Sequence, residues 1–150
     1  MRRQGGFTLL EMVVVLMLAA AIFAFAAGAM GRRLPGQQLK IAAKEVAAQL
    51  RYTRAQAIAT GKSQLFTFDA NTHEWQAGVR HHGKLPKGIK VVATGARNES
   101  QRPGVAAVRF FPEGAATGGR LVLSQGKAAW QVDVQWLTGQ VSLQRSTALP

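Results

Sequence analysis

The stretch that decides the fold is Gly6-Phe7-Thr8-Leu9-Leu10-Glu11, followed by residues 12–31, MVVVLMLAAAIFAFAAGAMG. The 20 residues after Glu11 carry no charged and no polar side chain. A membrane-spanning helix needs about 20 such residues, at a rise of about 1.5 Å each. The sequence therefore predicts that residues 7–31 form an apolar helix that crosses a membrane.

Glu11 is the unusual residue of this segment, because an ionised carboxylate inside a bilayer costs about 3 kcal/mol on insertion scales. If the chain is cut between Gly6 and Phe7, the new amine of Phe7 lies four residues before Glu11. Positions four apart share one face of a helix. The carboxylate can then pair with this amine or with that of a neighbouring subunit, and the pair would set the axial register of packed helices. We therefore predict an assembly salt bridge at Glu11.

Three interpretations of the N-terminus compete. The first is a secretory signal peptide with Arg2 and Arg3 as its basic end, cleaved at Ala24-Phe25-Ala26. The second is a plain single-pass anchor. The third is a prepilin leader, because the string resembles the start of type IV pilins and their relatives: a short basic leader ending in Gly, then Phe-Thr-Leu, one apolar residue and Glu.

That resemblance implies how the N-terminus is processed and where the protein resides. Residues 1–6 would be a leader that a prepilin peptidase removes after Gly6, and the amine of Phe7 would be methylated. The protein would span the bacterial inner membrane once, with its C-terminal domain in the periplasm. Charge alone leaves the orientation open, because arginines flank the span on both sides.

A break at Leu34-Pro35-Gly36 separates this helix from a second helical pattern. Proline disfavours helix at the preceding residue and Gly36 adds freedom, so residues 32–61 read as a kink and an amphipathic continuation, or as a short gap followed by a new helix. An apolar stripe at spacings of four and three marks the continuation. Its positions are Leu39, Ala43, Val46, Leu50, Arg54 and Ala57, of which Arg54 is the one misfit.

After Gly61 the apolar period changes to two, which indicates short strands joined by tight turns. The expected strands include residues 65–68, 74–79, 88–92, 108–111, 121–123, 130–136 and 141–143. Residues 74–79 would place Trp75, Ala77 and Val79 on one face, and residues 130–136 would do the same for Trp130, Val132, Val134 and Trp136. Hairpin turns imply antiparallel sheet, and residues 93–104 read as a polar loop. The predicted fold class is α+β, a long N-terminal helix packed on an antiparallel β-sheet that residues 62–150 form.

The segment FFPEGAATGG at residues 110–119 narrows the resemblance from type IV pilins and their relatives in general to one group of them. It is similar to the hairpin of the H-type minor pseudopilins of type II secretion, a domain shared with minor pilins of the FimT and FimU kind. The matching positions are Phe111, Pro112, Gly114, Gly118 and Gly119. The resemblance implies a pilin-like fold and a structural subunit near the tip of the pseudopilus. The partners would be major and minor pseudopilins and, less directly, secreted cargo.

Composition removes several classes of function. The chain of 150 residues has no cysteine, which excludes disulfide modules, thiolate metal sites and a cysteine nucleophile. No catalytic constellation and no phosphate-binding loop stand out. His73, His81 and His82 are expected to be surface residues rather than a metal site. We therefore predict no catalytic residue, no metal and no cofactor.

The net charge of +12 raises the question of which partner a basic surface would bind. A basic surface of six residues, opposed only by Glu99, would attract phosphate backbones, anionic headgroups or an acidic partner: Arg80, Lys84, Lys87, Lys90, Arg97 and Arg102. It keeps a DNA-binding minor pilin as the alternative function. Nucleic acid is the less favoured partner, because no aromatic residues for base stacking are interleaved with these cations.

Overall fold

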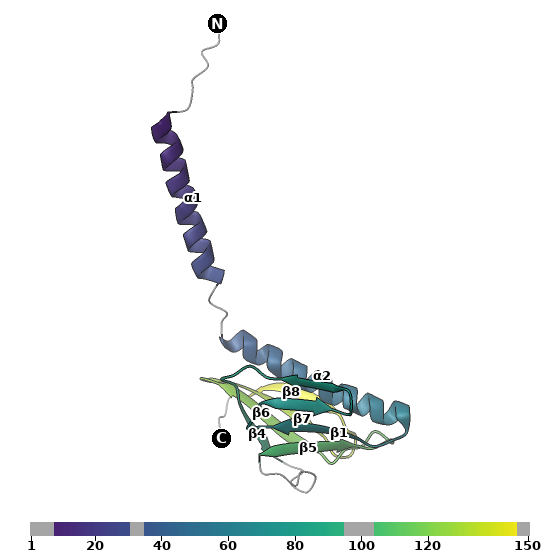
Figure 1. Cartoon of the computed structure of the whole chain (residues 1–150). Coiled ribbons are helices and arrows are strands. Elements are labelled where there is room, and N and C mark those ends of the chain that lie inside the picture. Colours follow the sequence, from purple (N-terminus) through teal and green to yellow (C-terminus); the bar gives the residue numbers. More distant parts are fainter. Residues whose placement is uncertain (1–7, 31–34, 95–103, 147–150) are drawn as a thin grey trace. The chain divides into compact units, whose positions relative to one another are not determined.

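The structure is a computed structural model that describes residues 8–30, 35–94 and 104–146. They fall into two units, residues 1–34 and 35–150. The first unit contains α1 (Leu9–Met30), shown in purple and blue in Figure 1. Within the part of the chain that the structure describes, no helix combines the length and the apolar character needed to cross a membrane.

In its described residues, the second unit contains one helix and two antiparallel sheets of four strands each. The helix is α2 (Pro35–Thr60). The first sheet has the order β3-β2-β1-β5, with β1 (Gln64–Asp69), β2 (Glu74–Ala77), β3 (His81–Lys84) and β5 (Val105–Phe110). The second has the order β4-β6-β7-β8, with β4 (Lys90–Thr94), β6 (Gly119–Gln125), β7 (Ala128–Val134) and β8 (Val141–Ser146).

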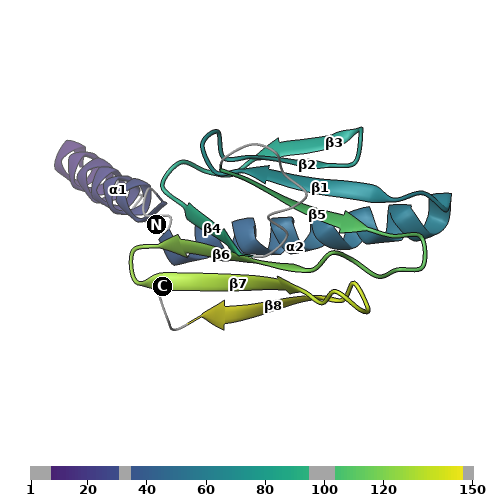
Figure 2. The same cartoon turned by 90° about the horizontal axis from the view of Figure 1, so that it is seen from below.

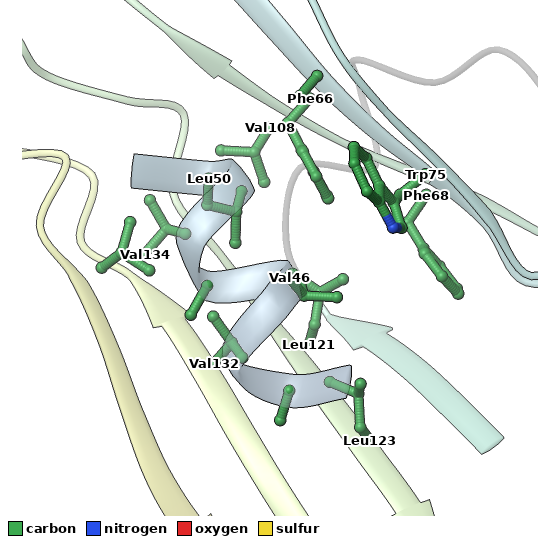
Figure 3. Packing of buried hydrophobic residues seen from close by; sticks show 14 of the residues in the cluster. Val46, Leu50, Phe66, Phe68, Trp75, Val108, Leu121, Leu123, Val132 and Val134 are labelled. Carbon is green, nitrogen blue, oxygen red and sulfur yellow. The ribbon is translucent and has the colours of Figure 1, made fainter. Parts of the chain in front are cut away.

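The helix α2 packs on the faces of both sheets (Figure 2). Its predicted stripe is confirmed, because Leu39, Ala43, Val46, Leu50 and Ala57 are all fully buried. Figure 3 shows Val46 and Leu50 between residues of the first sheet and residues of the second. The partners from the first sheet are Phe66, Phe68, Trp75 and Val108, and those from the second are Leu121, Leu123, Val132 and Val134.

The predicted fold class is confirmed, with α2 packed on antiparallel strands. The prediction did not divide the strands between two sheets. That division arises because β5 is followed by a loop at residues 111–118, after which β6 pairs with β4 and β7 rather than extending the first sheet. An isolated bridge between Phe110 and Ala116 joins β5 to this loop, and the N–H of Thr117 donates to the carbonyl of Arg109 at 2.9 Å.

Two apolar residues expected on the faces of strands, Val79 and Trp136, lie beyond the ends of those strands. β2 ends at Ala77, Gly78 turns the chain with a φ of +63°, and Val79 is 91% exposed. β7 ends at Val134, and Trp136 lies in the following turn, 68% exposed. In both cases the alternating pattern continues past the last ladder pair, so it does not mark the end of the strand.

Some boundaries of strands and loops also differ from the prediction. β3 was not predicted. β4 continues to Thr94, inside the stretch expected to be a polar loop. β5 begins at Val105 and ends at Phe110, before Phe111.

Candidate functional site

The N-terminal motif begins outside the described residues, where Gly6 and Phe7 lie. The described part starts at Thr8, whose Oγ1 accepts a hydrogen bond from the backbone N–H of Glu11 at 3.2 Å. Thr8 is therefore the N-cap of α1, and Glu11 is its third helical residue. The sequence Thr8-Leu9-Leu10-Glu11 fits the capping pattern [ST]-x-x-[DE], a signal that our sequence prediction did not use.

Glu11 is exposed on the first turn of α1. The free N–H groups of a helix N-terminus favour a negative charge there. The carboxylate is thus placed at the N-terminal end of α1, four residues along the sequence from Phe7.

The break at Pro35 and Gly36 coincides with the start of α2, since Pro35 is its first residue. Proline suits the first turn of a helix, where the missing N–H has no intrahelical acceptor. Residues 31–34 lie outside the described residues, so a kink between the two helices stays a prediction.

The predicted hairpin forms a closed loop between β5 and β6. The N–H of Phe111 donates to the carbonyl of Ala115 at 2.9 Å, and the N–H of Gly114 donates to the carbonyl of Phe111 at 2.9 Å. Gly114 and Gly118 have φ values of +89° and +76°, a region that glycine enters without the steric cost of a Cβ atom. Both therefore hold turn conformations that most other residues would strain. Pro112 occupies the first turn position after Phe111, and Gly119 begins β6.

A second loop, residues 135–140 between β7 and β8, lies directly against this hairpin. The N–H of Ala116 donates to the carbonyl of Trp136 at 2.8 Å. Gly139, with a φ of +61°, lies so close that an added Cβ would overlap the carbonyl oxygen of Gly114. The two loops thus form one structure, which we call the paired loops (residues 111–118 and 135–140).

Two arginines of α2 bind the backbone at this end of the domain. The Arg54 Nε donates to the carbonyl of Gly114 at 3.0 Å. One turn earlier, Arg51 Nη2 donates to the carbonyl of Val141 at 3.1 Å, at the start of β8. Arg54 was the misfit of the apolar stripe, and this contact explains it: a cation on the core-facing side satisfies a loop carbonyl. The apolar stripe shows that Arg54 is out of place, but it does not predict which group Arg54 binds, because Gly114 is 60 residues away in the sequence.

The paired loops also expose apolar side chains. Trp136 and Leu137 are 68% and 67% exposed, and Ile58 near the end of α2 is 49% exposed. An added Cβ at Gly114 would lie 3.4 Å from Ile58 Cδ1, so Ile58 flanks the hairpin. Large exposed apolar residues close together are typical of contact surfaces between proteins.

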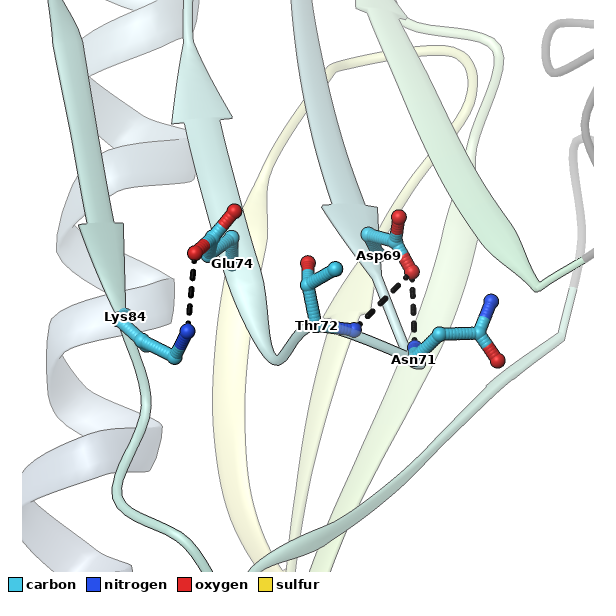
Figure 4. A network of polar contacts seen from close by, with 5 residues as sticks. All are labelled: Asp69, Asn71, Thr72, Glu74 and Lys84. Atoms are coloured by element: carbon cyan, nitrogen blue, oxygen red, sulfur yellow. Dashed lines mark hydrogen bonds and ion pairs between the residues drawn. The ribbon is translucent and has the colours of Figure 1, made fainter.

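The predicted basic surface is only partly brought together. Arg80 precedes β3, Lys84 ends it, Lys87 lies in the next turn, and Lys90 begins β4 in the other sheet. Arg97 and Arg102 lie outside the described residues. Lys84 Nζ pairs with Glu74 Oε1 at 2.9 Å (Figure 4), and this hydrogen bond and its charge lower the pKa of the Glu74 carboxyl below its usual value.

The three histidines have different surroundings. His81 and His82 are exposed, and the His81 ring stacks on Tyr52 with 4.3 Å between centroids. His73 is partly buried and its Nε2 lies 2.9 Å from the carbonyl oxygen of Ile89, so the expectation that it is a surface residue was only partly right. Among the described residues, no three His, Asp or Glu side chains gather in a way that could hold a metal ion.

Comparisons with known proteins agree with this geometry. The family described as Type II transport protein GspH matches residues 42–139, which include α2 from Ala42 onward and the paired loops up to Gly139. The family described as Prokaryotic N-terminal methylation motif matches residues 1–30. A protein named Type II secretion system protein H, from Xanthomonas campestris pv. campestris, is 47% identical over 140 residues, which cover 93% of this chain and 83% of that protein.

Two solved structures share the fold. The minor pseudopilin EpsH from the Type 2 Secretion System of Vibrio cholerae superposes with a TM-score of 0.58 at 17% identity, over 72% of this chain and 97% of EpsH. The type IV minor pilin FimU of Pseudomonas aeruginosa gives 0.58 at 14% identity, over 76% of this chain and 93% of FimU. The family match and the identity of the Xanthomonas relative together confirm the H-type resemblance: the chain belongs to the GspH family of type II transport proteins.

Proposed function

We propose that this protein is a minor pseudopilin of the type II secretion system. It is a structural subunit at or near the tip of the periplasmic pseudopilus and helps to export folded proteins across the outer membrane. The observation that carries the proposal is the 47% identity with the Xanthomonas protein named Type II secretion system protein H, over 93% of this chain.

The N-terminal motif supports a specific maturation. A prepilin peptidase cuts after Gly6, and the amine of Phe7 is then methylated. Residues 7–31 anchor the protein in the bacterial inner membrane, which it spans once, and the domain of residues 35–150 lies in the periplasm. The match of residues 1–30 to the methylation motif and the uncharged run after Glu11 support this arrangement.

Within a filament, Glu11 pairs with the amine of Phe7 on the same or a neighbouring subunit. The cap at Thr8 supports this role, because it fixes where the helix starts and therefore which turn carries the carboxylate. The partners are other major and minor pseudopilins, the prepilin peptidase during processing and, at the tip, secreted cargo. The protein performs no catalysis and needs no cofactor, since its role is structural: it adds a folded domain to a filament of packed N-terminal helices.

A second candidate is a minor pilin of the FimU kind, involved in pilus assembly or DNA uptake. The equal TM-scores of EpsH and FimU favour keeping it, since the fold fits both. A cross-linked pull-down of the full-length protein from its native membrane separates the two candidates. Recovery of pseudopilins, with N-methylated Phe7 as the first residue of the digest, is expected. Recovery of pilus subunits alone would favour the second candidate.

Glu11→Ala tests the assembly role. The variant should insert and be cleaved as usual, because the apolar run and the leader are intact. Its cross-linking to other pseudopilins should fall about tenfold, because the Phe7 amine loses its counter-charge, which corresponds to about 1.4 kcal/mol. Quantitative mass spectrometry of the cross-linked peptides measures this.

The matched control is Glu45→Ala, which removes the same carboxylate from the partly buried side of α2. It should leave the yield of cross-links unchanged. Equal yields for Glu11→Ala and the wild type would show that Glu11 has no part in assembly.

A further inference from the structure

One edge of the first sheet is formed by β3, which has one neighbouring strand, β2, among the described residues. We call His81, His82, Gly83 and Lys84 the β3 edge. The N–H of Leu85, just after this strand, points toward β2, since it donates to the carbonyl of His73 at 2.8 Å. N–H groups alternate in direction along a strand, so those of His82 and Lys84 point away from β2. The β3 edge therefore presents the backbone groups of two residues, spaced as an added strand requires.

The charge around the β3 edge is positive. Between Glu74 and Glu99 the sequence has no carboxylate. The Arg80 guanidinium is exposed, and the cation at the end of the strand, Lys84, is held by Glu74 in a pair whose side chains are 54% and 55% exposed. An exposed ion pair contributes at most about 1 kcal/mol, so Lys84 can exchange Glu74 for a carboxylate of a partner. An edge with this charge repels basic segments and attracts acidic ones.

A cavity lies at the start of the β3 edge, between α2 and the turn that follows β2. Its volume is about 180 Å³, several times the roughly 30 Å³ that one water occupies in the liquid. It is lined on the helix side by Tyr52 and Gln56, and on the turn side by Arg80 and His81. The stacking of His81 on Tyr52 forms one wall. The phenol, amide and guanidinium groups around the cavity are hydrogen-bond donors, and the guanidinium carries a positive charge that suits a carboxylate.

We propose that the β3 edge binds an extended, acidic segment of a partner protein. The segment adds as a fifth strand to the first sheet, with main-chain hydrogen bonds to His82 and Lys84. One of its carboxylates enters the cavity beside Arg80 and Tyr52. Main-chain pairing gives the affinity in this mode of recognition, and the side-chain site gives the selectivity. The proposal does not depend on the assembly role of Glu11, because the site lies wholly within residues 35–150.

The test uses the full-length protein in detergent micelles and a fluorescent peptide of eight residues that alternates Val and Glu. Alternation places all glutamates on one face of the added strand. We expect saturable binding by fluorescence anisotropy, and at least tenfold weaker binding of the same peptide with Gln in place of Glu. Equal binding of the two peptides would overturn the proposal. Tighter binding of a single-stranded oligonucleotide than of the acidic peptide would also overturn it, in favour of nucleic acid.

Two pairs of variants locate the site. Arg80→Gln should weaken binding of the acidic peptide about fivefold, whereas Lys127→Gln, which removes one exposed cation from the turn between β6 and β7, should leave it unchanged. His82→Pro should abolish binding because it removes the outward N–H, whereas His82→Ala retains that N–H and should keep most of the affinity. Equal affinities within either pair would overturn the proposal. If His82→Pro does not fold, the comparison of Arg80→Gln with Lys127→Gln still decides.

Discussion

Gly139 shows how much of this domain depends on single backbone positions. It has a positive φ, and the carbonyl of Gly114 occupies the space that a side chain would need. A non-glycine residue in the left-handed region costs about 1 kcal/mol, and overpacking adds about 1–3 kcal/mol. The close approach of two glycines from separate loops thus fixes the geometry of the paired loops.

Gly139→Ala is therefore expected to lower the free energy of unfolding by about 2–4 kcal/mol. The matched control is Gly126→Ala, since Gly126 has nearly the same φ, +60° against +61°, but no atom within 4 Å of an added Cβ. The control should lose only about 1 kcal/mol. Urea unfolding followed by tryptophan fluorescence measures both, and equal losses would show that the contact with Gly114 costs nothing.

Single residues also show where sequence reasoning reached its limit. Gly114 and Gly118 of the hairpin have positive φ, a local property that residue type reports, whereas Gly119 begins β6. The partner of Arg54 was not predicted, because a contact across 60 residues leaves no periodic signal in one sequence. The cap at Thr8 could have been predicted, since its capping pattern is local.

At the scale of elements, α2 is the best predicted part of the protein. A stripe over about five turns of helix averages out individual misfits, and the burial of Leu39, Val46 and Leu50 confirms it. The strand β3 was missed because His-His-Gly-Lys has no apolar residue and no β-branched residue, so pairing with β2 alone makes it a strand. Trp136 was wrongly placed because its spacing continues that of β7 into a turn.

The attachment of α2 to the paired loops can be tested through Arg54. Arg54→Leu should lower the free energy of unfolding by about 1.5–3 kcal/mol, because the carbonyl of Gly114 loses a charged donor. Lys44→Leu is the control, since it removes an exposed cation from the same helix, and it should change stability by less than about 0.5 kcal/mol. Chemical denaturation of the full-length protein compares them. Similar values for the two variants would show that the contact of Arg54 contributes nothing to stability.

At the scale of the whole molecule, the fold class followed from a helical period that changes to a strand period near Gly61. The division of the described strands into two sheets did not follow from the sequence. Strand pairing is a choice among many registers of nearly equal local energy, and contacts between distant segments, such as that of β4 with β6, decide it. The stretch of about residues 70–105 gave no recognisable motif, yet it contains β2, β3 and β4, and its residues 77–81 line the cavity beside Tyr52.

The domain of residues 35–150 is expected to fold and remain monomeric when expressed alone. It contains the whole buried core, from Leu39 to Val141. Light scattering coupled to size-exclusion chromatography measures its mass. Self-association that Trp136→Ser and Leu137→Ser abolish would contradict this expectation and identify the exposed turn of the paired loops as a contact between copies.

The course of α2 through the domain has a mechanical consequence. The chain enters this unit at Pro35 and runs for 26 residues, about 39 Å, to the paired loops, with side chains packed on both sheets along the way. A pull along the axis of this helix loads its buried contacts in parallel, as in shear, rather than opening them one after another. The arginine contacts near its far end, to Gly114 and Val141, share that load with the turns of both sheets. Tension applied at Pro35 is therefore carried along α2 to the paired loops, within one folded unit.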